Sequence, residues 1–308
     1  MEHLLRLTGI RFFAACLVLL NHLSINGEGP LGTLARHGFV GVSIFFSLSG
    51  FVISYSYRDR LTTGTVGTGQ FLATRAARLF PIHWTVGIII VAALPHLYSL
   101  EHLSTLAFIS NGALLQSWLP SNTYYFSINR PAWSISNELF FYISFIFLAK
   151  LSVRHLSALF LILLTLVLCS AGVAWSTGFG EKVVAGSASL SHWLFYINPA
   201  FRLLEFLTGM LLFEVFRTGF RIKAADIWQA WAVVFLIATI LTAKHLPDEF
   251  RYSVWFLPAI AALILSIALS EEGWLARLCS YGWVVILGEA SFVLYLTHQI
   301  GRASCRER

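Results

Sequence analysis

Long apolar stretches separated by short polar segments run through the whole sequence. Stretches long enough to cross a membrane, at about 20 mostly apolar residues each, lie at 7–24, 39–57, 80–98, 134–150, 156–175, 197–216, 227–244, 252–270 and 282–300. The stretch 103–118 is apolar but short, and Asn111 and Gln116 interrupt it. It fits a tenth span, a re-entrant piece or an interfacial helix. We therefore expect an all-α, polytopic membrane bundle of about nine to ten transmembrane helices.

The composition supports a membrane protein. Of the 308 residues, 57% are hydrophobic and 12% are charged, and this charged share is about half of that in soluble domains. We assign the net charge of +6 to arginines at cytoplasmic ends of spans and expect no nucleic-acid partner. The four scattered cysteines form no CxxC pair, so they predict neither a disulfide framework nor a metal site.

Loop charge predicts the orientation of the spans. The segment after the second span is the most basic in the chain and contains Arg58, Arg60, Arg75 and Arg78. Cytoplasmic loops carry an excess of Lys and Arg, which places this segment in the cytoplasm. The basic segments at 150–154 and 217–223 fall on the same side only if 103–118 does not cross. We therefore favour nine crossings with a cytoplasmic N-terminus.

The end of the sequence departs from this pattern. Residues 301–308 carry Arg302, Arg306 and Arg308 on the translocated side and match neither a span nor a domain. We interpret residues 1–300 as one membrane domain and 301–308 as an aberrant or disordered tail of a C-terminally truncated chain.

Two ionisable residues of the first span, Arg11 and His22, lie on one side of a helix. They are eleven residues apart, so they differ by roughly 20° around the helix axis and by about 16 Å along it. Because buried Arg and His are costly in hydrocarbon, such residues usually face a bundle interior and mark a functional path. The alternative is that Arg11 reaches the inner headgroups and His22 lies at the outer interface.

Two later segments carry candidate chemistry. Arg75 and Arg78 share a helix face, and two guanidiniums there suit a bound phosphate group. The alternative is that they only mark the cytoplasmic side of the membrane, with Pro81 starting the third span. Glu138 lies one turn into a helix and faces Tyr142 at i+4. A carboxylate this near hydrocarbon is costly unless it is paired. It would orient a histidine or hold a cation, or it is simply favoured by the helix dipole.

The remaining polar residues in apolar helices form one pair and one stripe. Arg202 and Glu205 are three residues apart, and we expect a structural ion pair. Ser291, Tyr295 and His298 fall at i, i+4 and i+7. Such a stripe either lines a polar cavity or joins helices.

Six segments, in this order, resemble the integral-membrane acyltransferase family 3, whose members O-acetylate bacterial surface glycans. The segments are Leu7–Ala15 with His22, Gly41–Phe51, Arg75–Pro81, Trp133–Tyr142, Arg202–Gly209 and Ser291–His298. Thr8 and Ser43 stand where many members carry Asp, so neither position is credited with a carboxylate role. The helix that usually follows the last segment is missing, and so is the esterase-like domain that some members append.

The resemblance implies an acyltransferase of the bacterial inner (plasma) membrane. It would move an acyl group, usually acetyl, from cytoplasmic acyl-CoA to a hydroxyl of an extracytoplasmic or lipid-linked saccharide. His22 would act as general base or as acyl carrier, and Arg11 would position the donor or stabilise the oxyanion. Glu138 would orient His22. Arg75 and Arg78 would bind the coenzyme phosphates. The expected substrate-binding residues are Trp133, Tyr142, Ser291, Tyr295 and His298, and no metal is expected.

Two other function classes fit the same intramembrane charges. A proton-coupled transporter of small molecules or lipids would use them for coupling, although the repeated halves frequent in transporters are not evident. A non-catalytic sensor or scaffold is the third class, and it should tolerate His22→Ala. Within the enzyme class the sequence does not choose among O-antigen, exopolysaccharide, peptidoglycan, a lipid-linked oligosaccharide and a hydrophobic natural product as acceptor.

Overall fold

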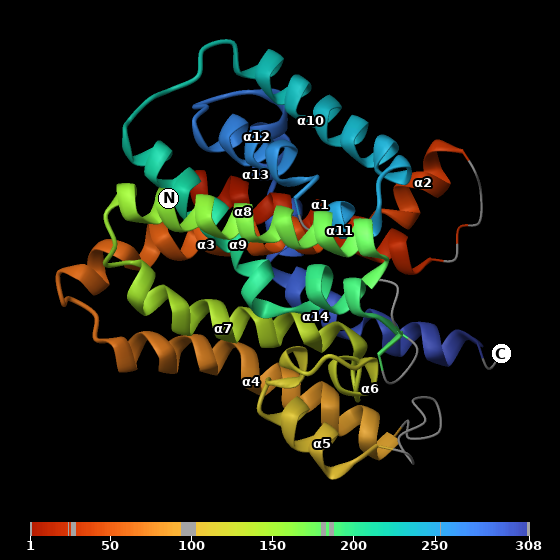
Figure 1. The fold of residues 1–308 in the computed structure, drawn as a ribbon. Helices are drawn as coiled ribbons and strands as arrows, with labels where there is room; N and C mark the ends of the chain where they lie inside the picture. Colours follow the sequence, from red (N-terminus) through yellow and green to blue (C-terminus); the bar gives the residue numbers. More distant parts are fainter. Residues whose placement is uncertain are drawn as a thin grey trace.

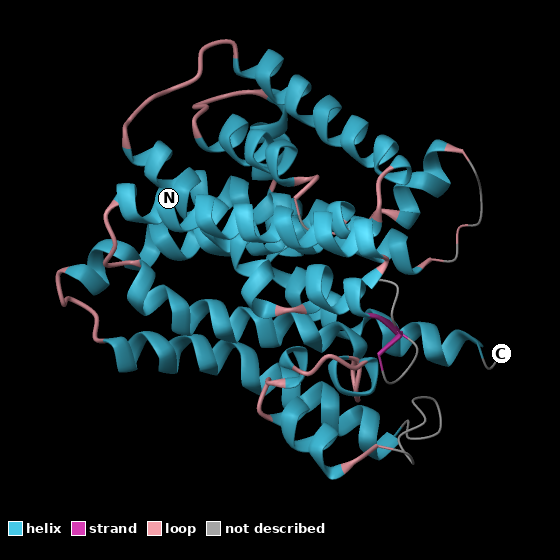
Figure 2. Ribbon diagram, in the orientation of Figure 1, coloured by secondary structure: helices cyan, strands magenta, loops and turns pink. Residues whose placement is uncertain are grey.

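The structure, a computed structural model, describes residues 2–23, 25, 29–93, 103–179, 183–184, 188–252 and 254–306. Its long helices run alongside one another between two ends of the molecule (Figure 1). The described strands are β1 (Val183–Val184) and β2 (Ala188–Ser189), which pair antiparallel (Figure 2). The predicted all-α architecture is confirmed.

The helices follow the predicted spans. In chain order they are α1 (Glu2–His22), α2 (Pro30–Arg36), α3 (Val40–Thr62), α4 (Thr68–Ala93), α5 (Thr105–Gly112), η3 (Gln116–Trp118), α6 (Asn122–Tyr125), η4 (Arg130–Ala132), α7 (Trp133–Leu148), α8 (Val153–Thr177), η6 (His192–Ile197), α9 (Pro199–Arg217), α10 (Ala225–Thr242), η7 (Ala243–His245), α11 (Asp248–Arg251), α12 (Leu257–Ala268), α13 (Trp274–Ser280) and α14 (Gly282–Arg306). Each predicted span overlaps a helix of this series. The backbone of 301–306 is helical, and residues 307 and 308 lie outside the described residues.

Among the described residues, five helices are long and apolar enough to cross a membrane: α1, α3, α4, α8 and α10 with η7. The pair α13 and α14 is a sixth if it is counted as one span bent by 69°. The count of nine to ten is therefore not reached by length and composition. The reasons are that α7 has 16 residues, α12 has 12, and α9 carries four charged residues among its 19.

The short apolar stretch 103–118 does not form a helix of membrane length. It folds into α5, a turn in which Leu114 has a φ of 57°, and η3. Side chains attach this segment to its neighbours: Gln116 Nε2 donates to the Ala132 carbonyl at 3.0 Å, and Ser117 Oγ donates to Ser136 Oγ at 2.6 Å. The segment thus packs against the start of α7.

The third helix of the bundle is central. Helix α3 packs closely on α9, and two glycines make that approach possible. A Cβ added to Gly50 would lie 2.0 Å from the Phe206 carbonyl oxygen, and one added to Gly209 would lie 1.9 Å from that of Ser47. Small residues that let backbones approach are the usual basis of helix packing in membranes.

The helix that contains the predicted third span starts well before Pro81. Helix α4 begins at Thr68 and continues through Arg75, Arg78 and Pro81. Pro81 lacks an N–H and would weaken a helix in water, but membrane helices tolerate such breaks when neighbours satisfy the freed groups. The two arginines therefore belong to a helix side rather than to a loop.

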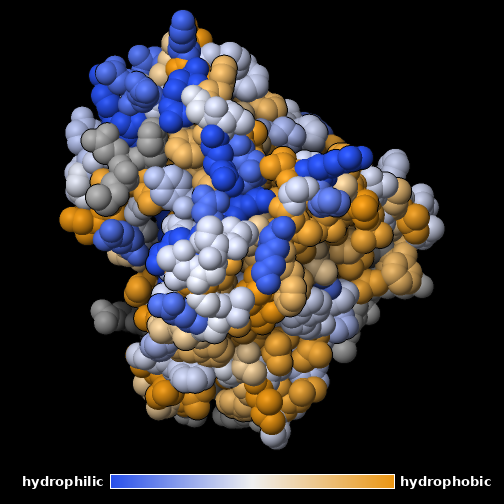
Figure 3. Space-filling view, turned by 90° about the vertical axis from the view of Figure 1, so that its left-hand side faces the viewer, coloured by the Kyte–Doolittle hydropathy of each residue, from blue (hydrophilic) through white to orange (hydrophobic). Residues whose placement is uncertain are grey.

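Hydrogen bonds hold together the end of the bundle that carries the basic segments. Arg58 donates to Glu214 Oε1 of α9 and to the Leu151 carbonyl, both at 2.6 Å. Arg217 lies 3.3 Å from Asp59. Helix α1 begins at this end, at the left of Figure 1, together with the α3–α4, α7–α8 and α9–α10 connections. Figure 3 faces it and shows a hydrophilic band beside extensive hydrophobic surface. We call it the basic end.

Candidate functional site

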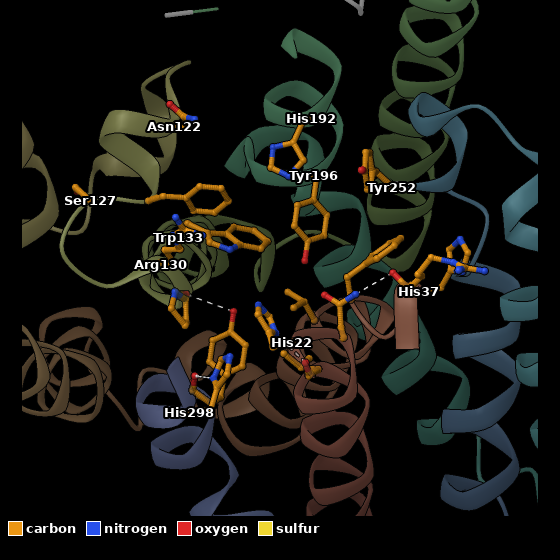
Figure 4. Close-up of a pocket in the computed structure, with 18 of the residues that line it drawn as sticks. His22, His37, Asn122, Ser127, Arg130, Trp133, His192, Tyr196, Tyr252 and His298 are labelled. Atoms are coloured by element: carbon orange, nitrogen blue, oxygen red, sulfur yellow. Dashed lines mark hydrogen bonds between the residues drawn. The ribbon is translucent and has the colours of Figure 1, made fainter. Parts of the chain in front are cut away.

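A cavity of about 1050 Å³, the large cavity, is lined by the C-terminal end of α1 and by residues of α2 and α6. These elements lie at the end of the bundle opposite the basic end (Figure 1). The wall of the cavity combines His22 of α1, Trp133 of α7, Tyr196 of η6 and His298 of α14 (Figure 4). These residues come from segments far apart in the sequence. The cavity therefore exists only in the assembled bundle.

Two histidines meet in this wall. The ring centroids of His22 and His298 are 4.6 Å apart, with 62° between the ring planes. Nδ1 of His22 lies 2.8 Å from the Val18 carbonyl oxygen, and Nδ1 of His298 lies 2.6 Å from that of Tyr295. Because a carbonyl oxygen only accepts, each Nδ1 carries the proton, and each Nε2 of the neutral rings is the basic nitrogen.

Aromatic rings form another part of the wall. The Tyr196 centroid lies 4.8 Å from Trp133 and 5.2 Å from Tyr252, and Phe39 lies 5.3 Å from Tyr252. Behind Tyr196, the guanidinium carbon of Arg202 is 5.2 Å from its ring. Such large rings with polar tips suit a ligand that has both apolar faces and hydroxyl groups.

A second, smaller cavity of about 50 Å³ lies among α1, α3, α4, α7 and α14. It brings together residues from five of the six segments singled out in the sequence. The predicted site residues in its wall are Arg11, Arg75, Arg78, Glu138, Tyr142, Ser291 and Tyr295. Three guanidiniums thus face one carboxylate, and the small cavity is an electropositive site.

Hydrogen bonds order part of the small cavity. Tyr142 donates from its hydroxyl to Glu138 Oε2 at 2.7 Å, as the i+4 spacing predicts. Arg75 Nη2 donates to the Tyr57 hydroxyl at 3.0 Å, and its guanidinium carbon lies 4.8 Å from the Tyr57 ring. Arg75 Nε is buried and has no hydrogen-bond partner within the described part of the chain. One donor at this site is therefore left for a ligand.

Tyr295 separates the two cavities. Its side chain and that of Val42 line both of them. The Tyr295 hydroxyl donates to the Pro131 carbonyl at 3.3 Å, which ties α14 to η4, immediately before α7. The two cavities therefore adjoin at Tyr295 and Val42.

The predicted catalytic residues do not all share one cavity. Arg11 and Glu138 line the small cavity and His22 lines the large one. Nδ1 of His22 is bonded to the Val18 carbonyl, so a role for Glu138 in orienting that nitrogen finds no support. The predicted substrate-binding residues also divide: Tyr142 and Ser291 line the small cavity, and Trp133 and His298 line the large one.

Arg202 and Glu205 form the expected ion pair. Their side chains are 2.7 Å apart and only 1% and 2% exposed. Arg202 also donates to the Tyr252 carbonyl at 2.9 Å and to Ser43 Oγ at 3.2 Å. Neither member of the pair lines either cavity, which agrees with a structural role.

Sequence reasoning missed several polar residues of the large cavity. They lie on short connecting segments with no helical periodicity: Arg36, His37, Arg130, His192, Lys244 and Arg251. One signal was present, because basic residues at the end opposite the basic loops run against the usual charge bias of membrane proteins. Burial lowers the pKa of His192 from its ordinary value to about 4, so this ring is neutral near pH 7.

Comparisons with known proteins identify the family of the chain. A family described as an acyltransferase domain matches residues 4–302. Acyltransferase MdmB of Streptomyces mycarofaciens is 30% identical, over 95% of this chain and 77% of that protein. Exopolysaccharide production protein ExoZ of Rhizobium meliloti (strain 1021) is 27% identical, over 85% of this chain and 75% of that protein.

A third relative is longer than the matched region. Putative peptidoglycan O-acetyltransferase YrhL of Bacillus subtilis (strain 168) is 26% identical, over 95% of this chain and 47% of that protein. No solved structure matches the chain. The family match runs from α1 to α14 and includes every residue of both cavities. Of the three function classes considered from the sequence, these matches support the enzyme. The chain belongs to the integral-membrane acyltransferase family that its motifs resemble.

Proposed function

We propose that this acyltransferase moves an acyl group, acetyl in the simplest case, from acyl-CoA to a saccharide hydroxyl across the two cavities. The observation that carries the proposal is that an arginine-lined cavity and a histidine-lined cavity meet at Tyr295. The first suits an anionic donor, and the second suits proton transfer from an acceptor. Relatives named for exopolysaccharide production and peptidoglycan O-acetylation support a saccharide acceptor.

The proposed orientation puts the donor on the cytoplasmic side. Helix α1 begins at the basic end, and the connections after α3, α7 and α9 lie there too. An excess of Lys and Arg is typical of cytoplasmic ends. On this orientation α7, α9 and α12 complete nine crossings, and residues 103–118 stay on the outer side.

The small cavity is proposed to hold the thioester end of the donor. Arg75 and Arg78 would bind phosphate groups of the coenzyme through forked donors. Arg11 would orient the thioester carbonyl and stabilise the oxyanion as it forms. Glu138, held by Tyr142, would keep these guanidiniums apart and positioned.

His22 is proposed as the general base. Its Nε2 removes the proton of the acceptor hydroxyl, and the oxygen attacks the thioester carbonyl carbon. The C–O bond forms, the C–S bond breaks, and the coenzyme thiolate leaves and receives the proton. The Val18 hydrogen bond supports this role because it leaves Nε2 as the basic nitrogen. The imidazole of His298 would position His22 and the hydroxyl.

Thiol release from acetyl-CoA tests the proposal. The protein in lipid nanodiscs would be supplied with acetyl-CoA and a saccharide mixture, and free coenzyme thiol would be measured. We expect His22→Ala to reduce acceptor-dependent release by about 10²- to 10⁴-fold, the usual share of a general base. His155→Ala is the matched control, because His155 is exposed on α8 and lines neither cavity. Equal release from both variants would exclude His22 as the base.

A further inference from the structure

The wall of the large cavity is strongly cationic. Four Arg and Lys side chains lie in it, and no Asp or Glu is among its described lining residues. The four are Arg36 of α2, Arg130 of η4, Lys244 of η7 and Arg251 of α11. A general base and a hydroxyl acceptor do not by themselves need such a surface.

Two of these cations, Arg36 and Arg251, lie near His37. Burial lowers the pKa of His37 most, and the positive charges of Arg251 and Arg36 lower it further, against a backbone hydrogen bond to Thr33. Lys244 lies in the wall of the same cavity and is exposed. We call Arg36, Lys244 and Arg251 the outer cation cluster.

Two described carboxylates near the cluster, Asp248 and Glu249, lie outside the cavity wall. Asp248 pairs with Arg251 but does not line the cavity. Glu249 is buried, accepts a hydrogen bond from Ser191 at 2.7 Å, and does not line the cavity either. Among the described lining residues, four side chains are cationic and none is a carboxylate, so this part of the wall carries positive charge.

The cluster is tied to the proposed base. Asn21 immediately precedes His22, and its Nδ2 donates to the carbonyls of Ala35 and Arg36 at 3.0 and 2.8 Å. The end of α2 is therefore held against the end of α1. His22 and Arg36 therefore line the same cavity from two helix ends that are bonded to each other.

The position of the cluster has no topological explanation. It lies at the end opposite the basic end, whereas an excess of basic residues orients membrane proteins toward the cytoplasm. Forked guanidiniums and ammonium groups are the side chains that bind phosphate and carboxylate. A cavity of this size with such side chains in its wall suits an anionic ligand.

We propose that the acceptor is an anionic saccharide, whose phosphate or carboxylate binds the outer cation cluster while its hydroxyl lies at His22. This inference rests on the proposed acyl transfer and narrows its substrate class. A sugar phosphate and a sugar acid present the same anionic chemistry. The charge is on a phosphate group in the first and on a carboxylate in the second, and the experiment below distinguishes the two.

Binding of three small probes tests the inference without coenzyme. Methyl β-glucoside, methyl β-glucuronide and glucose 1-phosphate would be titrated into the protein in nanodiscs, with affinities measured by saturation-transfer NMR. We expect at least one charged probe to bind about tenfold more tightly than the glucoside, a preference that declines as salt rises. The glucuronide and the phosphate distinguish a carboxylate from a phosphate group.

Paired variants identify the residues responsible. Arg36→Gln combined with Lys244→Gln should abolish the preference, whereas Lys223→Gln, a change outside the cavity, should preserve it. Both mutated side chains are exposed, and unchanged thermal midpoints would show that the fold is retained. Three results would overturn the inference. They are equal affinity for the charged and neutral probes, no binding of any probe, and a preference for charged probes that persists in the double variant.

Activity separates the two proposals. A protein that binds the anionic probes but transfers no acyl group would overturn the proposed function alone. A protein that acylates the neutral glucoside as fast as the charged probes would overturn the anionic acceptor alone.

Discussion

One hydrogen bond decides which nitrogen of His22 is basic. The Val18 carbonyl accepts from Nδ1, so Nε2 remains as the basic nitrogen of the ring. The ring of His298 lies beside it, from the other end of the chain. Spacing within α14 predicted a polar stripe at this position. It gave no sign of the contact with α1, because spacing describes one helix at a time.

Substitution of His298 tests its proposed positioning role. We expect His298→Ala to lower kcat about tenfold, less than His22→Ala, because the base itself remains. His298→Gln should recover part of the loss through its side-chain hydrogen bonds. The checks are kcat and KM for the acceptor at saturating donor. A loss equal to that of His22→Ala would instead make His298 a second base.

His192 should make the fold sensitive to acid. Burial lowers its pKa from the ordinary 6.5 to about 4, and its Nδ1 lies 3.3 Å from the Tyr125 hydroxyl. As pH falls from 6.5 to about 4, the unfolded chain gains a proton that the folded protein does not, so stability falls through this window. The loss is at most on the order of 3 kcal/mol.

Thermal midpoints between pH 7.5 and 4.5 measure this effect. His192→Asn should lose less stability than the unchanged protein over that range, while His155→Asn, at an exposed site, should behave like the unchanged protein. Parallel pH curves for all three proteins would contradict a buried neutral His192.

At the scale of elements, apolar stretches predicted where the long helices lie. A segment that crosses a membrane must satisfy its backbone hydrogen bonds within itself, and a helix does so. Boundaries were less predictable. Helix α4 begins at Thr68 since helical hydrogen bonding continues through the arginines and Pro81. The segments α2, α6 and η6 build much of the large cavity, yet their short lengths carry no periodic pattern.

The contact between α3 and α9 should not tolerate a methyl group. We expect Gly209→Ala to cost about 1–3 kcal/mol, since overpacking forces backbones apart. The added Cβ would meet the Ser47 carbonyl oxygen at 1.9 Å. Gly172→Ala in α8 is the control, because nothing lies within 4 Å of its added Cβ. Thermal midpoints in nanodiscs compare the two, and equal midpoints would contradict the close approach.

At the scale of the whole molecule, charge and cavities divide along the bundle axis. Basic connections lie at one end, and the large cavity opens at the other. Loop charge predicted that the basic connections share one end, because translocation disfavours Lys and Arg. It did not predict a cavity at the other end. Which helices adjoin depends on packing between distant segments, so the convergence of Arg11, Arg75 and Glu138 on one cavity was beyond the sequence pattern.

Labelling of single cysteines in cells tests the proposed orientation. In a chain whose four native cysteines are replaced, Thr65→Cys marks the α3–α4 connection and Leu31→Cys marks α2. We expect an impermeant thiol reagent to modify the cysteine at 31 and to reach the one at 65 only after permeabilisation. The reverse pattern would invert the proposed sides of donor and acceptor.

Donor titration most directly tests the division of labour between the two cavities. Thiol release would be measured against acetyl-CoA concentration for His22→Ala, for Arg75→Gln with Arg78→Gln, and for Arg60→Gln with Arg154→Gln as control. For the Arg75→Gln and Arg78→Gln double variant, we expect the KM for the donor to rise at least about tenfold while kcat is nearly unchanged. For His22→Ala, we expect kcat to fall by about 10²-fold or more while the KM for the donor is unchanged. The control pair lines neither cavity and should leave both constants unchanged. Loss of kcat alone in the Arg75 and Arg78 variant, or an unchanged kcat in His22→Ala, would contradict the two-cavity account.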